Sequence, residues 1–174
     1  EAVGVVAAIV PWNYPQALAA FKLAPALAAG CTVVLKASPE TALDAMVFAE
    51  AAAEAGIPPG VLNVVPGGTR AGAHLVSHPG VDKVSFTGST RAGKRVTELA
   101  AGTVKRVALE LGGKSANILL PDLDDETLDK AARNAVSAAF LNSGQTCSAL
   151  TRLLVPADRK DQVVDILRDE VEST

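Results

Sequence analysis

Short runs of β-branched residues alternate with alanine-rich stretches along the first 111 residues, and this rhythm constrains the fold more than any other feature. We expect strands at residues 3–10, 32–36, 61–65, 81–87 and 104–111, with helices between them at residues 16–29, 41–55, 70–77 and 89–101. Such alternation forms right-handed βαβ units around a parallel sheet. Because the strands are apolar nearly throughout, helices should cover both faces. The predicted fold class is α/β, with a parallel sheet of about five strands.

The rhythm changes after Gly113, where a short strand is followed by a longer helix and a polar loop. We expect a short strand at residues 117–120 and a long helix with an acidic start at residues 125–141. A polar loop at residues 142–148, a strand at residues 151–156 and a final amphipathic helix at residues 158–171 should follow. The acidic start suits the positive end of a helix dipole. We therefore predict one domain over residues 1–112 and the start of a second α/β domain over residues 113–174.

Composition excludes several classes of protein. The formal net charge is −3 and the basic residues are scattered, so nucleic-acid binding is not expected. No apolar run approaches the roughly 20 residues that cross a bilayer. Two cysteines are too few for a disulfide scaffold in 174 residues, which favours reduced thiols and a cytoplasmic location. His74 and His78 lack a third ligand nearby, so no metal site is predicted.

Two glycine-rich turns, residues 67–72 and 88–93, each follow a predicted strand and precede a helix. In a parallel sheet, ligands bind at the carboxyl ends of strands, where helix N-termini attract phosphate. Neither turn has the G-x-G-x-x-G pattern, and plain βα turns remain an alternative. The second turn, with Lys94, nearly matches a phosphate-binding P-loop, but Arg95 stands where Ser or Thr would hold Mg²⁺. Nucleoside triphosphate binding is therefore a less favoured alternative.

Cys147 lies in a polar, glycine-containing loop, Asn-Ser-Gly-Gln-Thr-Cys-Ser, after the long predicted helix. A cysteine that only packs does not require such surroundings, although a single loop cysteine is a weak signal. Cys31, beside Gly30 at the entrance to a strand, is expected to be a buried structural thiol. Cys147 is therefore the candidate nucleophile.

Four segments, taken together and in this order, resemble the aldehyde dehydrogenase superfamily over essentially the whole chain. They are residues 11–15 (PWNYP), 86–89 (FTGS), 109–114 (LELGGK) and 144–147 (GQTC). The resemblance implies a Rossmann-like dinucleotide-binding domain followed by part of the catalytic domain. It also implies NAD(P)-dependent oxidation of a small-molecule aldehyde to a carboxylic acid.

Three catalytic roles follow from this resemblance. Cys147 matches the nucleophile that forms a thiohemiacetal and then a thioester, and Asn13 matches the residue that stabilises the oxyanion. Glu110 matches the general base that activates water to hydrolyse the thioester. Family members that transfer the acyl group to coenzyme A generally lack this glutamate, so the resemblance favours a free acid as product.

The resemblance also implies a set of cofactor-binding residues: Pro11, Trp12, Lys36, Ser38, Gly68, Gly72, Phe86, Gly88, Ser89 and Leu111. One position departs from the pattern. Many NAD-preferring relatives carry Glu three residues after the lysine, where it accepts hydrogen bonds from the ribose and repels a 2′-phosphate. Here Pro39 occupies that position and Glu40 follows it. NAD is the favoured cofactor, and NADP remains open.

Members of this family are much longer than 174 residues. The resemblance therefore implies that the chain covers only part of a parent protein, itself a homodimer or homotetramer. We expect the isolated chain to be inactive. A catalytically silent fragment that only binds nucleotide is the alternative to an enzyme.

Overall fold

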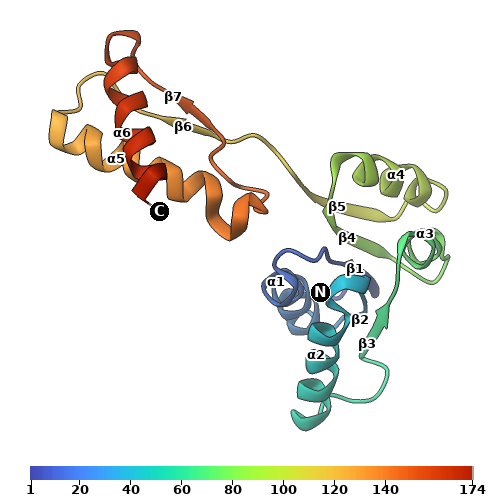
Figure 1. Cartoon of the computed structure of the whole chain (residues 1–174). Helices are drawn as coiled ribbons and strands as arrows, with labels where there is room; N and C mark the ends of the chain where they lie inside the picture. Colours follow the sequence, from blue (N-terminus) through green and yellow to red (C-terminus); the bar gives the residue numbers. More distant parts are fainter. Residues whose placement is uncertain (174) are drawn as a thin grey trace. The chain divides into compact units, whose positions relative to one another are not determined.

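The computed structural model describes residues 1–173, which divide into two compact units, Glu1–Leu111 and the residues from Gly112 onward. The first unit runs from blue to yellow-green in Figure 1, and the second from yellow to red. The second unit begins one residue before the predicted second domain. Each unit has its own hydrophobic core.

A five-stranded parallel sheet forms the centre of the first unit, in the order β3-β2-β1-β4-β5. All four neighbouring pairs are parallel. The strands are β1 (Val5–Ile9), β2 (Thr32–Ala37), β3 (Leu62–Pro66), β4 (Lys83–Gly88) and β5 (Arg106–Leu111). The predicted α/β class and five-stranded sheet are confirmed, with strand ends that differ by a few residues.

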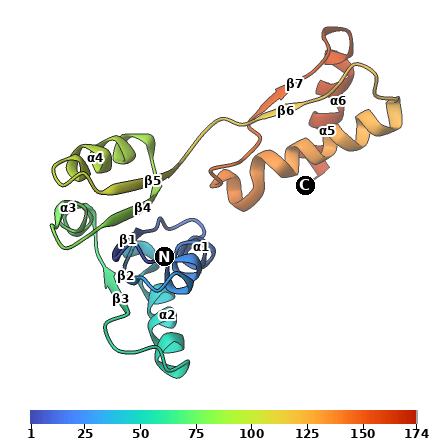
Figure 2. The same ribbon diagram turned by 180° about the vertical axis from the view of Figure 1, so that it is seen from behind.

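Helices lie on both faces of this sheet (Figure 2): α1 (Pro15–Ala28), α2 (Ala42–Glu54), α3 (Thr69–Ser77) and α4 (Thr90–Ala101). The alternation along β1 defines the two faces. Val6 and Ala8 pack with residues of α1 and α2, whereas Ala7 and Ile9 pack with residues of α3 and α4. The central strand is therefore buried on both sides, as its apolar sequence predicts.

The edge strand β5 is covered on one face only. Leu109 and Leu111 pack against the core formed with α4, whereas Arg106, Ala108 and Glu110, on the opposite face, are exposed. The expectation of apolar strands covered on both faces is therefore wrong for this edge. Polar residues alternate with apolar ones there because only one side is packed.

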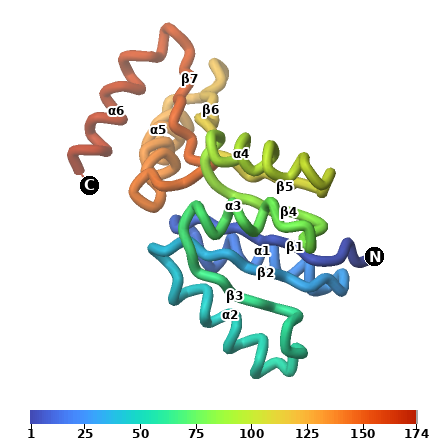
Figure 3. Tube along the Cα trace, turned by 90° about the vertical axis from the view of Figure 1, so that its right-hand side faces the viewer, coloured from blue at the N-terminus to red at the C-terminus, as the bar shows by residue number. Residues whose placement is uncertain are grey.

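The second unit pairs two short parallel strands, β6 (Ala116–Ile118) and β7 (Arg152–Leu154), with α5 (Asp125–Phe140) and α6 (Lys160–Ser173). Figure 3 shows the chain passing from α5 through β7 to α6. Asp124 caps α5 by accepting a 2.7 Å hydrogen bond from the Thr127 N–H, which lowers the pKa of this carboxyl. Arg133 links α5 to Glu170 of α6 at 3.0 Å. Within residues 1–173, none of the helices combines the length and apolarity needed to cross a membrane.

Candidate functional site

A cavity of about 630 Å³ opens at the carboxyl ends of β1, β2 and β4, and α3 and α4 contribute to its walls. Paired residues of three neighbouring strands form the bottom of this cavity, because Ile9 of β1 pairs with Lys36 of β2 and with Phe86 of β4. The three side chains share the face that α3 and α4 cover. The sheet thus presents one cationic, one aromatic and one aliphatic group in a row at the position where parallel sheets bind ligands.

Two helix N-termini reach this cavity. Gly68 and Thr69 begin α3, which has no side-chain cap, and Ser89 caps α4 by accepting a 3.2 Å hydrogen bond from the Ala92 N–H. Neither helix has an acidic residue in its first turn. The backbone N–H groups and both helix dipoles therefore favour an anionic ligand such as a phosphate.

Lys36 is the buried cation of the cavity. Its side chain runs past Gly72, where an added Cβ would lie 3.7 Å from the lysine Cδ atom. Burial lowers the pKa of Lys36, and the negative charge of Glu40 partly opposes this shift. A hydroxyl or anionic group bound in the cavity would offset the desolvation of the ammonium.

Ser38 and Glu40 flank Pro39, which stands where many NAD-preferring relatives carry Glu. All three residues line the cavity. The Ser38 hydroxyl donates a hydrogen bond to the Glu40 carboxylate. This bond lowers the pKa of Glu40. A carboxylate is therefore held at the cavity although residue 39 offers none.

The cavity brings together six of the predicted cofactor residues, namely Lys36, Ser38, Gly68, Gly72, Phe86 and Ser89. The other four do not line it. Pro11 and Trp12 lie between β1 and α1, Gly88 ends β4, and Leu111 ends β5. Gly88 leaves room for the Phe86 ring, since an added Cβ would lie 2.5 Å from its Cζ atom.

Arg91 and Arg95 of α4 also line the cavity, and neither was predicted as a cofactor residue. Their spacing of four residues at the start of a helix after a strand was the available signal. The same helix argues against a P-loop. It begins at Thr90, so residues 88–94 do not form an open loop, and Lys94 is exposed and outside the cavity lining.

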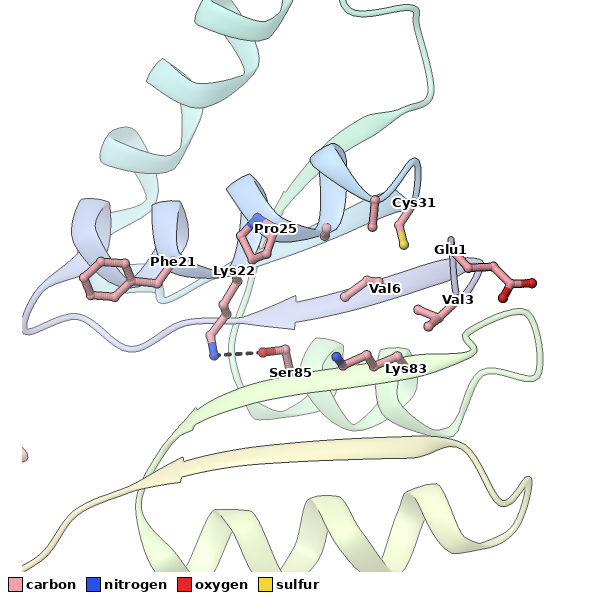
Figure 4. A pocket seen from close by; sticks show the side chains of 11 residues that line it. Glu1, Val3, Val6, Phe21, Lys22, Pro25, Cys31, Lys83 and Ser85 are labelled. Carbon is pink, nitrogen blue, oxygen red and sulfur yellow. Dashed lines mark hydrogen bonds between the residues drawn. The ribbon is translucent and has the colours of Figure 1, made fainter.

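Glu110 is exposed on the open face of β5, the face toward which Lys22 of α1 points. The Lys22 Nζ atom donates a 3.1 Å hydrogen bond to Ser85 Oγ (Figure 4). Burial lowers the pKa of Lys22, and the charge of Glu110 opposes this shift. Lys22 and Ser85 line a second, smaller hollow of about 260 Å³, together with the buried Cys31. Asn13 is half-buried between β1 and α1.

Cys147 lies in the second unit and is exposed, whereas Cys31 is 4 % exposed. The segment before Cys147 has an unusual backbone. Asn142, Ser143 and Gly144 have φ values of 53°, 57° and 75° in succession. Left-handed conformations cost about 1–2 kcal/mol for residues with a Cβ, and they concentrate at functional sites. The Thr146 hydroxyl closes the loop by donating a 3.0 Å hydrogen bond to the Leu141 carbonyl.

Residues 1–173 contain no group of three or more His, Cys, Asp or Glu side chains that could hold a metal ion. The rings of His74 and His78 lie 5.7 Å apart in an edge-on arrangement, with His78 at the end of α3.

Known proteins similar to this chain support one family. The model of the aldehyde dehydrogenase family matches residues 1–174. A geranial dehydrogenase of Castellaniella defragrans is 58% identical over 171 residues, which are 98% of this chain and 35% of that protein. Mutant aldehyde dehydrogenase C of Pseudomonas syringae, solved with NAD+ and octanal, has a TM-score of 0.94 and 49% identity, covering 98% of this chain and 35% of that one.

An NADP-dependent enzyme of Escherichia coli has a TM-score of 0.91 and 46% identity, covering 97% of this chain and 35% of that one. The chain therefore spans about a third of the length of the relatives it matches. Both nicotinamide dinucleotides occur among the names of these similar structures.

Proposed function

Because the chain belongs to the aldehyde dehydrogenase family, whose model matches residues 1–174, we propose that the protein containing it oxidises an aldehyde to a carboxylic acid. NAD or NADP accepts the hydride. The observation that carries this proposal is the cavity of the first unit, where Lys36, Phe86 and two helix N-termini meet at the carboxyl ends of parallel strands.

The residues of the cavity suit a dinucleotide. The N-termini of α3 and α4 and the side chain of Arg91 would attract the pyrophosphate. Lys36 would donate to ribose hydroxyls, which would relieve its desolvation. When bound, the nicotinamide supplies the hydride acceptor, and the remaining chemistry belongs to side chains of the protein.

Cys147 is the proposed nucleophile. Its thiolate adds to the carbonyl carbon, and the side-chain amide of Asn13 stabilises the negative charge on the carbonyl oxygen. Loss of hydride from that carbon leaves an acyl thioester on the sulfur. The exposure of Cys147 and the strained backbone just before it support this role, because a cysteine needed only for packing requires neither.

Glu110 is the proposed general base. It takes a proton from water, the resulting hydroxide attacks the thioester carbon, and the carboxylic acid leaves as Cys147 regains its thiolate. Exposure of Glu110 on the open face of β5 leaves this carboxylate accessible to water.

Calorimetry with NAD, NADP and Mg²⁺–ATP tests the nucleotide site on this chain. Binding of a dinucleotide is expected, and Lys36→Met should weaken it at least about tenfold, because a charged hydrogen bond contributes about 1.5–3 kcal/mol. Lys130→Met, on the exposed surface of α5, is the matched control. Tighter binding of Mg²⁺–ATP than of either dinucleotide would instead support the triphosphate-binding alternative.

The chemistry is tested in the complete protein by NADH or NADPH formation and by mass spectrometry of the acylated enzyme. Cys147→Ala should abolish both turnover and acylation. Glu110→Gln should let the acyl-enzyme accumulate while steady-state turnover falls by a factor of about 100–10,000. If turnover is unchanged in Glu110→Gln, the assignment of the base is contradicted. If the complete protein binds dinucleotide but oxidises no aldehyde, it is a silent nucleotide-binding protein.

A further inference from the structure

We infer that the hollow of about 260 Å³ between α1 and the sheet is a binding site for a small carboxylate with an apolar tail. The inference goes beyond the proposed function, because it concerns the face of the sheet opposite the nucleotide cavity. Phe86 lines that cavity, whereas its neighbour Ser85 lines the hollow. Successive residues of a strand point to opposite faces, so the sheet itself separates the two sites.

Three hydrogen-bond donors meet at one end of this hollow. Lys22 donates to the Ser85 hydroxyl at 3.1 Å, so the hydroxyl is the acceptor in that bond and its own proton can be donated to a ligand. Lys83 lies two residues before Ser85 on β4 and shares its face, and its ammonium points along the strand toward Ser85 (Figure 4). Two ammonium groups and one hydroxyl proton form a set of donors that a carboxylate fits.

The charges around these donors favour an anion. Within residues 1–173, neither Lys22 nor Lys83 forms an ion pair. Arg106 pairs with Lys83 in the β4–β5 register and adds a further cation on the same face. Glu1 also lines the hollow, but its carboxylate lies at the opposite end from Lys22 (Figure 4).

Lys22 gains most from a bound anion, because it is only 8 % exposed. Burial lowers the pKa of Lys22 even though the charge of Glu110 acts in the opposite direction. A buried ammonium without a close counter-charge costs free energy. A carboxylate beside Lys22 would supply that counter-charge.

The walls next to the donors are apolar and suit a short hydrocarbon tail. Phe21 and Pro25, one helical turn apart on α1, line the hollow together with Val6 of β1. The Phe21 side chain is 74 % exposed, so a tail packed against its ring would remove apolar surface from water. The volume of about 260 Å³ is below the roughly 300–1,000 Å³ of sites for drug-sized ligands, which favours a short chain.

Titration of this chain with sodium hexanoate, followed by heteronuclear NMR, tests the site. Hexanamide is the neutral probe of similar shape, and sodium chloride is the control for ionic strength. Hexanoate should bind with a dissociation constant of about 1 mM, as expected for a ligand of this size. Hexanamide should bind at least about tenfold more weakly, because a charged hydrogen bond contributes more than a neutral one.

Variants separate the head of the ligand from its tail. Lys22→Met should weaken hexanoate binding at least about tenfold. Lys94→Met removes the same charge from the exposed surface of α4, outside the hollow, and should leave binding unaltered. Phe21→Ala should weaken hexanoate but not acetate, which has no tail to reach the ring. The spectrum of each variant reports whether its fold is intact.

The competing result is binding of hexanoate in the nucleotide cavity, which also contains cations. Lys36→Met should leave hexanoate binding unaltered, and saturating ADP-ribose, the dinucleotide without its nicotinamide, should not displace hexanoate. If either change abolishes hexanoate binding, the carboxylate occupies the nucleotide cavity and the inference is overturned. Absence of saturable binding, or equal binding to wild type and Lys22→Met, also overturns it. None of these results affects the proposed function, which depends on dinucleotide binding and aldehyde oxidation.

Discussion

Lys22 donates a 3.1 Å hydrogen bond from its Nζ atom to Ser85 Oγ, and this contact joins α1 to β4 on the face of the sheet that also carries Glu110. The side chain of Lys22 is only 8 % exposed. One neutral hydroxyl and a nearby carboxylate do not compensate fully for this burial, because the pKa of Lys22 still lies below its ordinary value of 10.5. The lysine therefore costs stability while it is charged.

This cost predicts how stability depends on pH. Between the folded pKa of Lys22 and its unfolded value near 10.5, the unfolded chain binds more protons, so the free energy of unfolding contributed by Lys22 rises with pH. Lys22→Met should flatten that rise and stabilise the chain most near neutral pH. Urea unfolding at intervals from pH 7 to 10 measures the slope, and Lys94→Met, at an exposed site of the same unit, should leave it intact. A slope shared by wild type and Lys22→Met would show that Lys22 has no such effect.

The two cysteines should differ in reactivity. Cys147 is exposed and Cys31 is 4 % exposed, so iodoacetamide reaches Cys31 only when the structure opens locally. If local opening costs about 3 kcal/mol, Cys147 should be alkylated roughly a hundredfold faster than Cys31 at neutral pH. Mass-resolved alkylation measures both rates, and urea should bring them together. Faster labelling of Cys31 in the folded chain would refute the assignment of Cys147 as the reactive thiol.

Gly88→Ala should disturb the cavity through Phe86. The added Cβ would lie 2.5 Å from the Cζ atom of the ring, so the ring must move. Overpacking of this kind costs about 1–3 kcal/mol of unfolding free energy. Binding of ADP-ribose should weaken as well, because Phe86 lines the cavity. Gly102→Ala is the control, since its nearest neighbour is the Leu99 carbonyl oxygen at 4.0 Å and its φ of −60° suits alanine. Equal stability of the two variants would show that Phe86 has room to move.

The sequence was sufficient to predict the five strands of the first unit, because apolar runs and glycine-closed helices repeat there with little interruption. It did not predict Arg91 and Arg95 as cavity residues, because arginines on a helix look the same in sequence whether they face solvent or a ligand. The open face of β5 was missed because a single strand pattern does not show that the strand is an edge. The left-handed φ values of Asn142 and Ser143 depend on how the loop closes, and neither residue alone requires them. The roles of Cys147, Asn13 and Glu110 came from the resemblance and remain proposals.

Exposed apolar side chains in the second unit predict self-association. Phe140 and Leu141 are consecutive large residues, 65 % and 60 % exposed, at the junction of α5 and η2 (Leu141–Gly144). Exposed apolar clusters of this kind promote contacts between copies. Sedimentation of the chain should therefore show a concentration-dependent increase in mass, and Phe140→Ser should weaken it. Leu43→Ser removes an even more exposed apolar residue from α2 of the first unit and should leave association unchanged. A chain that stays monomeric at all accessible concentrations would contradict the prediction. If only Leu43→Ser abolished association, the associating surface would lie in the first unit instead.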